Sequence, residues 1–193
     1  MDGMTAGIKP HRFTVADYCR MTEAGLFGVH PRVELIRGEI IDMPAIGTPH
    51  LVMVNRLNRL LVLTVGARGI VSVQNSLRLD DSSEPEPDIA LLKPRADEYE
   101  AEHPGGSDAL LVIEVADTSL TYDRTVKAPL YAEGGVAEYW IINLADRAIE
   151  VHRQPTDGRY AQAWTARAGD MLDILLLPGV TLSPSDLFRP RAD

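Results

Sequence analysis

The sequence predicts a single domain of mixed α/β or α+β architecture, in which helices flank a central sheet. The chain has 193 residues, 45% of them hydrophobic, which is enough apolar material for one well-buried core but not comfortably for two. Helical and strand-like patterns follow one another in the order helix, β-hairpin, helix, strands, helix and strands, which is typical of one layered domain.

The same composition argues against several other protein classes. The longest apolar runs fall far short of the roughly 18–20 residues that a membrane span requires. The single cysteine, Cys19, excludes an intramolecular disulfide framework and a CxxC zinc site. The N-terminal segment has neither the basic start nor the apolar stretch of a secretory signal. We therefore expect a cytoplasmic protein without a membrane segment.

The first predicted elements are a helix and a hairpin. Thr14 followed by Asp17 resembles a capping box, so residues 1–30 are expected to form an N-terminal helical segment. Residues 33–43 alternate between apolar and polar and fold back at Arg37-Gly38, which predicts a β-hairpin.

A second helix follows the hairpin. Thr48 can cap it, Pro49 suits its first turn and Gly66 can end it. The first 80 residues carry 9 Lys and Arg against 7 Asp and Glu, whereas the rest of the chain carries 10 against 21. If the protein contacts phosphates, the first part, with Arg56 and Arg59 on this helix, is the better candidate for that side.

The remaining elements are mostly strands. Strand-like runs are expected at 70–79, 89–92, 110–115, 138–144, 148–153, 160–165 and 172–182. A third helix is expected between Thr121 and Glu133, where Pro129 would remove the backbone hydrogen bond to Thr125 and kink the axis.

Two acids stand out from this pattern. Glu114 interrupts the apolar run LLVIEVA, and a carboxylate in such a strand costs several kcal/mol unless it is paired or bound to a metal. Asp88 stands at the start of a short strand, after two prolines that force an extended approach. The alternatives are that Glu114 pairs with an arginine and that Asp88 is an ordinary acid at a strand entrance.

Two further residues could join these acids. Lys127 is one of only three lysines, and it lies on the helix that leaves the Glu114 strand and should pack back over the sheet. Glu34 lies in the predicted hairpin and reaches the other acids if the hairpin abuts them. The alternatives are a solvated helix lysine and an ordinary surface acid.

Such a group of residues suits phosphodiester hydrolysis. Two carboxylates on neighbouring strands can hold Mg²⁺ through hard oxygen ligands. The metal activates a water molecule and neutralises charge on a phosphodiester oxygen, and a nearby ammonium can orient the water or stabilise the phosphorane. Hydrolysis of a different phosphoester remains open.

Several segments resemble one family. VELIRGEII, the capped helix after Pro49, PEPDIALL, LLVIEVADTS and YDRTVKAPLYAEGGVAEYWIINLADRAIEVHR have the order and spacing of the Uma-type "putative restriction endonucleases", bacterial members of the PD-(D/E)XK nuclease-like superfamily. The resemblance runs from about Val33 to Arg153, and the terminal LLLPGVTLSPSDLF also looks like the family's ending.

The resemblance implies a restriction-endonuclease-like fold, in which a mixed central sheet is flanked by helices. The whole chain, 1–193, would form one domain. It would consist of the N-terminal helical segment, a catalytic core at 33–153 and C-terminal strands at 154–193.

The resemblance also implies a DNA cleavage site that depends on Mg²⁺, with Mn²⁺ as an alternative. Asp88 and Glu114 match the two metal-binding acids of the superfamily motif. The carbonyl of Val115 would be a further metal ligand by analogy. Glu34 matches the upstream acid that often completes the site.

The chain departs from the superfamily motif at the lysine. The lysine should stand two positions after Glu114, but Ala116 is there. The resemblance implies that Lys127, on the following helix, places its amine in the same space.

Other polar residues near the motif are weaker candidates: His50, Ser119, Asp123 and Tyr131. Asp123 and Lys127 are spaced i, i+4 and could simply pair. His50 lacks ligand spacing and is expected on the surface of its helix. The acidic run 84–102 is expected to be a solvated loop rather than a metal site.

The leading interpretation is an endonuclease that hydrolyses DNA phosphodiester bonds. The alternative is a non-catalytic nucleic-acid-binding or protein-interaction module on the same fold, because a fold does not fix a function. The net charge of −9 favours that alternative, whereas acids retained in apolar strands favour the nuclease. No separate DNA-reading domain is recognisable, and a homodimer, with one site for each DNA strand, stays open.

Overall fold

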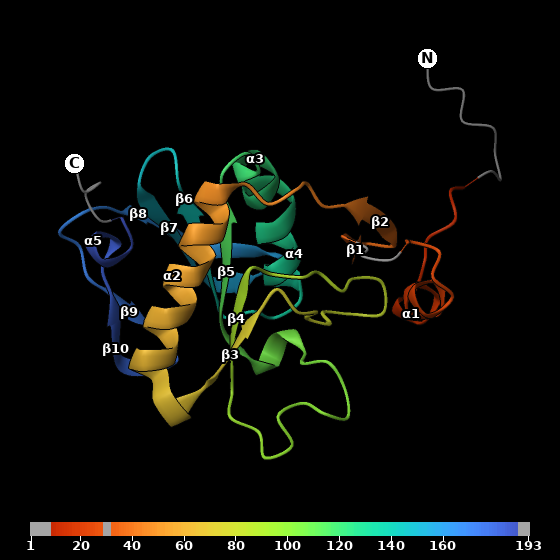
Figure 1. The fold of residues 1–193 in the computed structure, drawn as a ribbon, viewed down its shortest axis with the longest axis horizontal. Helices are drawn as coiled ribbons and strands as arrows, with labels where there is room; N and C mark the ends of the chain where they lie inside the picture. Colours follow the sequence, from red (N-terminus) through yellow and green to blue (C-terminus); the bar gives the residue numbers. More distant parts are fainter. Residues whose placement is uncertain (1–8, 29–31, 189–193) are drawn as a thin grey trace.

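The framework of the protein is a six-stranded mixed sheet in the order β3-β4-β5-β6-β7-β8 (Figure 1). The computed structural model describes residues 9–28 and 32–188. Neighbouring strands are antiparallel except β5 and β6, which are parallel. The strands are β3 (Ile70–Val73), β4 (Ile89–Leu92), β5 (Ala109–Ala116), β6 (Glu138–Asn143), β7 (Ala148–Thr156) and β8 (Arg159–Ala166).

Helices cover both faces of this sheet. Successive side chains of a strand point to opposite faces, and because side chains on both faces are buried, both faces need cover. On one face α2 packs on Leu91, Leu111 and Trp140, and on the other face α4 packs on Val112 and Ile141. The fold class is therefore the predicted one. The covering elements are α2 (Thr48–Val65), η1 (Gly66–Arg68), η2 (Gly106–Asp108), α3 (Leu120–Tyr122), η3 (Asp123–Lys127), α4 (Ala128–Glu133), β9 (Leu172–Ile174), β10 (Leu177–Leu182) and α5 (Pro184–Leu187).

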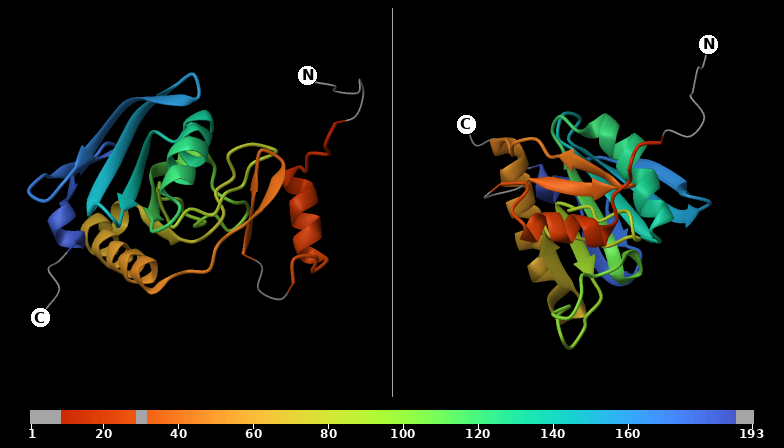
Figure 2. Two further views of the ribbon diagram at one scale, coloured as in Figure 1. Left: turned by 90° about the horizontal axis from the view of Figure 1, so that it is seen from above. Right: turned by 90° about the vertical axis from the view of Figure 1, so that its right-hand side faces the viewer.

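The N-terminal elements form a small unit of their own beside the sheet (Figure 2). It consists of α1 (Val15–Glu23) and the hairpin of β1 (Val33–Ile36) and β2 (Glu39–Asp42), which share a small apolar cluster. The predicted capping box is confirmed, because the Thr14 hydroxyl accepts from the Asp17 N–H at 3.1 Å. Residues 1–8 and 29–30 of the predicted helical segment lie outside the described residues.

The hairpin is held against the loop before β4. Arg37 and Gly38 form its turn. Both have a positive φ, of 48° and 75°, and such a turn matches the twist of the two strands that it joins. The Glu84 N–H donates to the Leu35 carbonyl at 2.8 Å. Glu84 is buried and accepts from His103 at 2.8 Å. The expected solvated loop at 84–102 is wrong over residues 84–92, which are buried or, at Glu86, half-buried and which include β4.

Three further predictions need correction. The strand-like run at 172–182 is an antiparallel pair, β9 and β10, in a two-stranded sheet apart from the central one. The second helix begins at Thr48, but its cap is Gly47, so Thr48 is the first helical residue rather than the cap. The strand predicted at 70–79 ends at Val73, because Gln74 adopts a left-handed φ of 52° and turns the chain out of the sheet.

The predicted helix at 121–133 contains a π turn. Pro129 has no N–H with which to bond the Thr125 carbonyl. The preceding turn widens, and the Ala128 N–H donates to the carbonyl of Asp123, five residues back. Instead of a simple kink, the helix has a wide turn that ends at Lys127.

No helix in the described part of the chain combines the length and apolarity needed to cross a membrane.

A close backbone contact yields a first prediction. A Cβ on Gly106 would overlap the Gly134 carbonyl oxygen, whereas a Cβ on Gly105 would meet its nearest atoms at 3.6 Å. We expect Gly106→Ala to lower the free energy of unfolding by about 1–3 kcal/mol and Gly105→Ala to change it by less than about 0.5 kcal/mol. Urea unfolding followed by circular dichroism measures both, and equal effects would contradict this packing.

Candidate active site

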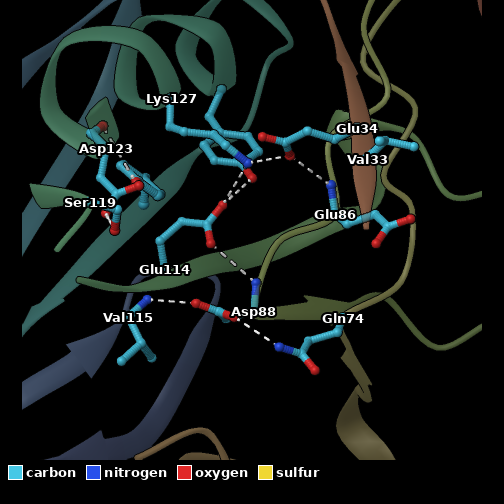
Figure 3. Close-up of polar contacts among 12 residues, drawn as sticks. Val33, Glu34, Gln74, Glu86, Asp88, Glu114, Val115, Ser119, Asp123 and Lys127 are labelled. Carbon is cyan, nitrogen blue, oxygen red and sulfur yellow. Dashed lines mark hydrogen bonds and ion pairs between the residues drawn. The ribbon is translucent and has the colours of Figure 1, made fainter. Parts of the chain in front are cut away.

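Four charged side chains singled out in the sequence line one pocket of about 740 Å³ (Figure 3). Asp88 immediately precedes β4, Glu114 lies in β5, Glu34 lies in β1 and Lys127 ends η3. Two sheets and a helical segment thus converge on the same space.

Lys127 is the central contact of the group. Its Nζ donates to Glu34 Oε2 at 2.5 Å and to Glu114 Oε1 at 3.2 Å, and the residue is only 4% exposed. Burial alone would lower the pKa of Lys127, but the carboxylates of Glu114 and Glu34 outweigh burial and raise it. Lys127 is therefore a buried cation at neutral pH.

Glu114 is satisfied on both carboxylate oxygens. Its Oε1 also accepts from the Tyr131 hydroxyl at 2.7 Å, and its Oε2 accepts from the Asp88 N–H at 3.2 Å. Burial raises the pKa of Glu114, and the Asp88 carboxylate adds to that rise, whereas the Lys127 ammonium lowers the pKa and favours the ionised carboxylate. The predicted alternative of an arginine partner is wrong, because the partner is a lysine.

The Asp88 carboxylate is held by three donors. Its Oδ2 contacts His50 Nε2 at 2.9 Å and accepts from the Val115 N–H at 2.8 Å, while Oδ1 accepts from Gln74 Nε2 at 3.2 Å. Sequence reasoning placed His50 on the helix surface, but the first turn of α2 aims it at Asp88. The hydrogen bond to Asp88 raises the pKa of His50, against the effect of burial.

Other polar residues complete the wall of the pocket. Asp123 accepts from the Ser119 hydroxyl at 2.6 Å rather than pairing with Lys127 as considered above, and burial raises its pKa to about 6. The Tyr122 hydroxyl and His50 Nδ1 are buried and have no hydrogen-bond partner among the described residues.

The pocket is strongly acidic. Seven of its lining residues are Asp or Glu, and its two formally positive residues are Arg32 and Lys127. Arg56, expected to face phosphates, instead donates to the carbonyl of Leu187. Within 9–28 and 32–188, no group of three or more His, Cys, Asp or Glu side chains is assembled to hold a metal ion.

Sequence reasoning missed the contacts of His50 and Gln74 and gave Tyr131 no partner. A buried tyrosine needs a partner for its hydroxyl, and that need is the signal that could have linked Tyr131 to Glu114. For Gln74 the sequence gives a weaker signal, because a glutamine does not by itself predict the left-handed backbone conformation that this residue adopts.

The sheet order and the pocket define a protein of restriction-endonuclease-like fold. The family model of Uma2, described as "Putative restriction endonuclease", matches residues 15–185, and the chain belongs to this family. The predicted resemblance is thereby confirmed.

A solved structure supports the same fold. The chain is similar to a crystal structure described as "a putative nuclease belonging to DUF820 from Anabaena variabilis", with a TM-score of 0.66 and 16% identity over 91% of this chain and 97% of that one. No curated protein matches the chain.

The buried pairs of Lys127 yield a second prediction. Removing the ammonium in Lys127→Met leaves two buried carboxylates without their cation, so we expect the free energy of unfolding to fall by about 3–5 kcal/mol. Adding Glu34→Gln should then cost less than the same change in the wild type, with a coupling of about 0.5–3 kcal/mol. Urea unfolding of the four proteins of this cycle measures the coupling.

The matched control is Lys93→Met, because Lys93 is exposed and its ammonium, among the described residues, donates only to the Ser107 carbonyl, at 2.7 Å. We expect a change within about 0.5 kcal/mol. If Lys127→Met were as mild as this control, the buried pairs would not stabilise the fold.

Proposed function

We propose that this chain is a metal-dependent endonuclease that hydrolyses DNA phosphodiester bonds. One observation carries the proposal: the buried cation of Lys127 joins Glu34 and Glu114 on the wall of the pocket that Asp88 also lines. Burying charged groups costs desolvation free energy, so two acids and a lysine are unfavourable choices if the pocket wall is purely structural. The same groups are those that phosphodiester hydrolysis uses. Membership of the family described as "Putative restriction endonuclease" supports the same activity.

The donor set suits a hard cation such as Mg²⁺, or Mn²⁺ in its place. Asp88 Oδ1 and Glu114 Oε2 each accept one hydrogen bond, of 3.2 Å, and so retain acceptor capacity. Mg²⁺ is usually held by one or two carboxylates together with water and substrate phosphate, so it needs no preassembled cluster of three side chains. We propose Asp88, Glu114 and the Val115 carbonyl as its protein ligands.

Such a cation would supply charge neutralisation at the phosphodiester and a more acidic water. The roles of the other residues follow from their contacts. Lys127 places a permanent positive charge at the pocket wall, where charge builds up on the phosphoryl oxygens. Glu34 and Tyr131 fix the ammonium and the Glu114 carboxylate in position, and His50 and Gln74 do the same for Asp88.

A plasmid-nicking assay tests the activity. We expect the wild type to nick supercoiled DNA with Mg²⁺ or Mn²⁺ and to lose activity when EDTA is added. Asp88→Asn and Glu114→Gln should each lower the rate about 100-fold or more, because each removes a charged ligand. Glu102→Gln, an exposed acid outside the pocket, is the matched control and should cut at the wild-type rate.

Two results would reject the proposal. Nicking that survives in both pocket variants would point to a contaminating nuclease or another site. DNA binding by the wild type without any cleavage would favour the non-catalytic module instead.

Lys127 should act on turnover rather than on metal binding. For Lys127→Ala, assayed at a temperature where circular dichroism shows it folded, we expect the nicking rate to fall about 100-fold, as for other groups that stabilise transition-state charge. The Mg²⁺ dissociation constant, measured by calorimetry, should change by about 10-fold at most, the low end for a group that contacts a ligand without being one. A larger loss in metal affinity than in turnover would contradict this role.

A further inference from the structure

The outward face of α2 is apolar at both ends. In Figures 1 and 2 this helix lies on the outside of the molecule. Its large exposed apolar side chains are Leu51 (49% exposed), Val52 (46%), Val62 (52%) and Leu63 (75%). Solvated helices normally place polar residues at such positions.

Two polar residues lie between the apolar ends of this face. Asn55 and Arg59 are exposed, and neither has a side-chain hydrogen bond or ion pair with the described residues. At 3.6 residues per turn, these two and the four apolar residues fall within an arc of about 120° on the helix surface. We call these six residues the α2 stripe.

From either end, the α2 stripe has the same order of residue types: an apolar pair, then two separate polar residues, then a second apolar pair. The stripe is centred on position 57 and is extended by two small residues, Thr48 and Gly66, at equal distances from that centre. A surface of this kind matches itself after a two-fold rotation, which is the property that a symmetric dimer interface requires.

We propose that the α2 stripe is the interface of a homodimer in which two copies of α2 pack antiparallel. The rotation places Leu51 against Val62 and Val52 against Leu63 of the second copy. It also places the Asn55 amide oxygen beside the Arg59 guanidinium of the second copy, so that an acceptor meets a donor twice. The small residues at both ends let the helices approach closely.

The chemistry of the stripe favours a second copy over other partners. The chain carries 28 acidic residues, yet none lies in the stripe. A nucleic acid would need more than one cation here, and the stripe offers only Arg59. The apolar pairs and the polar pair instead complement the α2 stripe of a second copy related by the two-fold rotation.

Solution mass tests the interface. By light scattering we expect twice the 21.2 kDa mass of one chain. Leu63→Asp puts two charges into the interface and should raise the dimer dissociation constant about 100-fold or more. The matched control is Leu176→Asp, an exposed leucine between β9 and β10, which should leave the dimer unchanged. A monomeric wild type, or a dimer that Leu63→Asp leaves intact, would overturn the proposal.

Disulfide trapping tests the antiparallel register. The exposed Cys19 is first changed to Ser. Leu51→Cys combined with Val62→Cys should then cross-link the dimer on oxidation. Each single cysteine should not, because residue 51 lies about 18 Å along the helix from its own symmetry mate. Cross-linking by the single variants would mean a parallel arrangement and would overturn the proposal.

Neither measurement uses nuclease activity, so this inference and the proposed function can fail independently.

Discussion

The buried ammonium of Lys127 is the contact on which the pocket depends. It joins Glu34 from the small N-terminal sheet to Glu114 from the central sheet, and none of the three side chains is appreciably exposed. Two carboxylates brought this close together out of water repel each other and lose hydration. The cation between them offsets both costs, and it ties the N-terminal hairpin to the central sheet beside the backbone contacts of Leu35 and Gly38.

The position of Lys127 follows from a backbone irregularity. Pro129 deprives the helix of one hydrogen bond, and the turn before it widens so that residues 123–127 form a π turn. Such turns often occur at functional sites. Here the widened turn ends at the lysine, which reaches the carboxylates of two strands. In the proposed active site, Lys127 would supply from this helix the amine that a typical motif places two residues after Glu114, where this chain has Ala116.

The sequence predicted features that depend on local chemistry. The hairpin at Arg37-Gly38 and the buried Glu114 are both visible in residue types, because turn geometry and an acid in an apolar run are local signals. Contacts that depend on packing were not visible. His50 reaches Asp88 only because α2 covers the sheet at one particular register, and no pattern within α2 encodes that register. The sequence also could not show that β3 ends before Gln74, because a glutamine does not by itself indicate a left-handed backbone conformation.

The acidity of the chain acquires a different meaning once the pocket is located. A net charge of −9 argues against a nucleic-acid ligand if the charge is taken as a uniform surface property. Seven of the acids, however, line one pocket, where burial raises the pKa of Glu86, Glu114 and Asp123 and so favours their neutral forms. A polyanion cannot enter such a pocket on favourable electrostatics alone. A divalent cation held by Asp88 and Glu114 would offset two of these negative charges at the point where a phosphate would bind, so the metal would supply the local attraction for DNA that the acids lack.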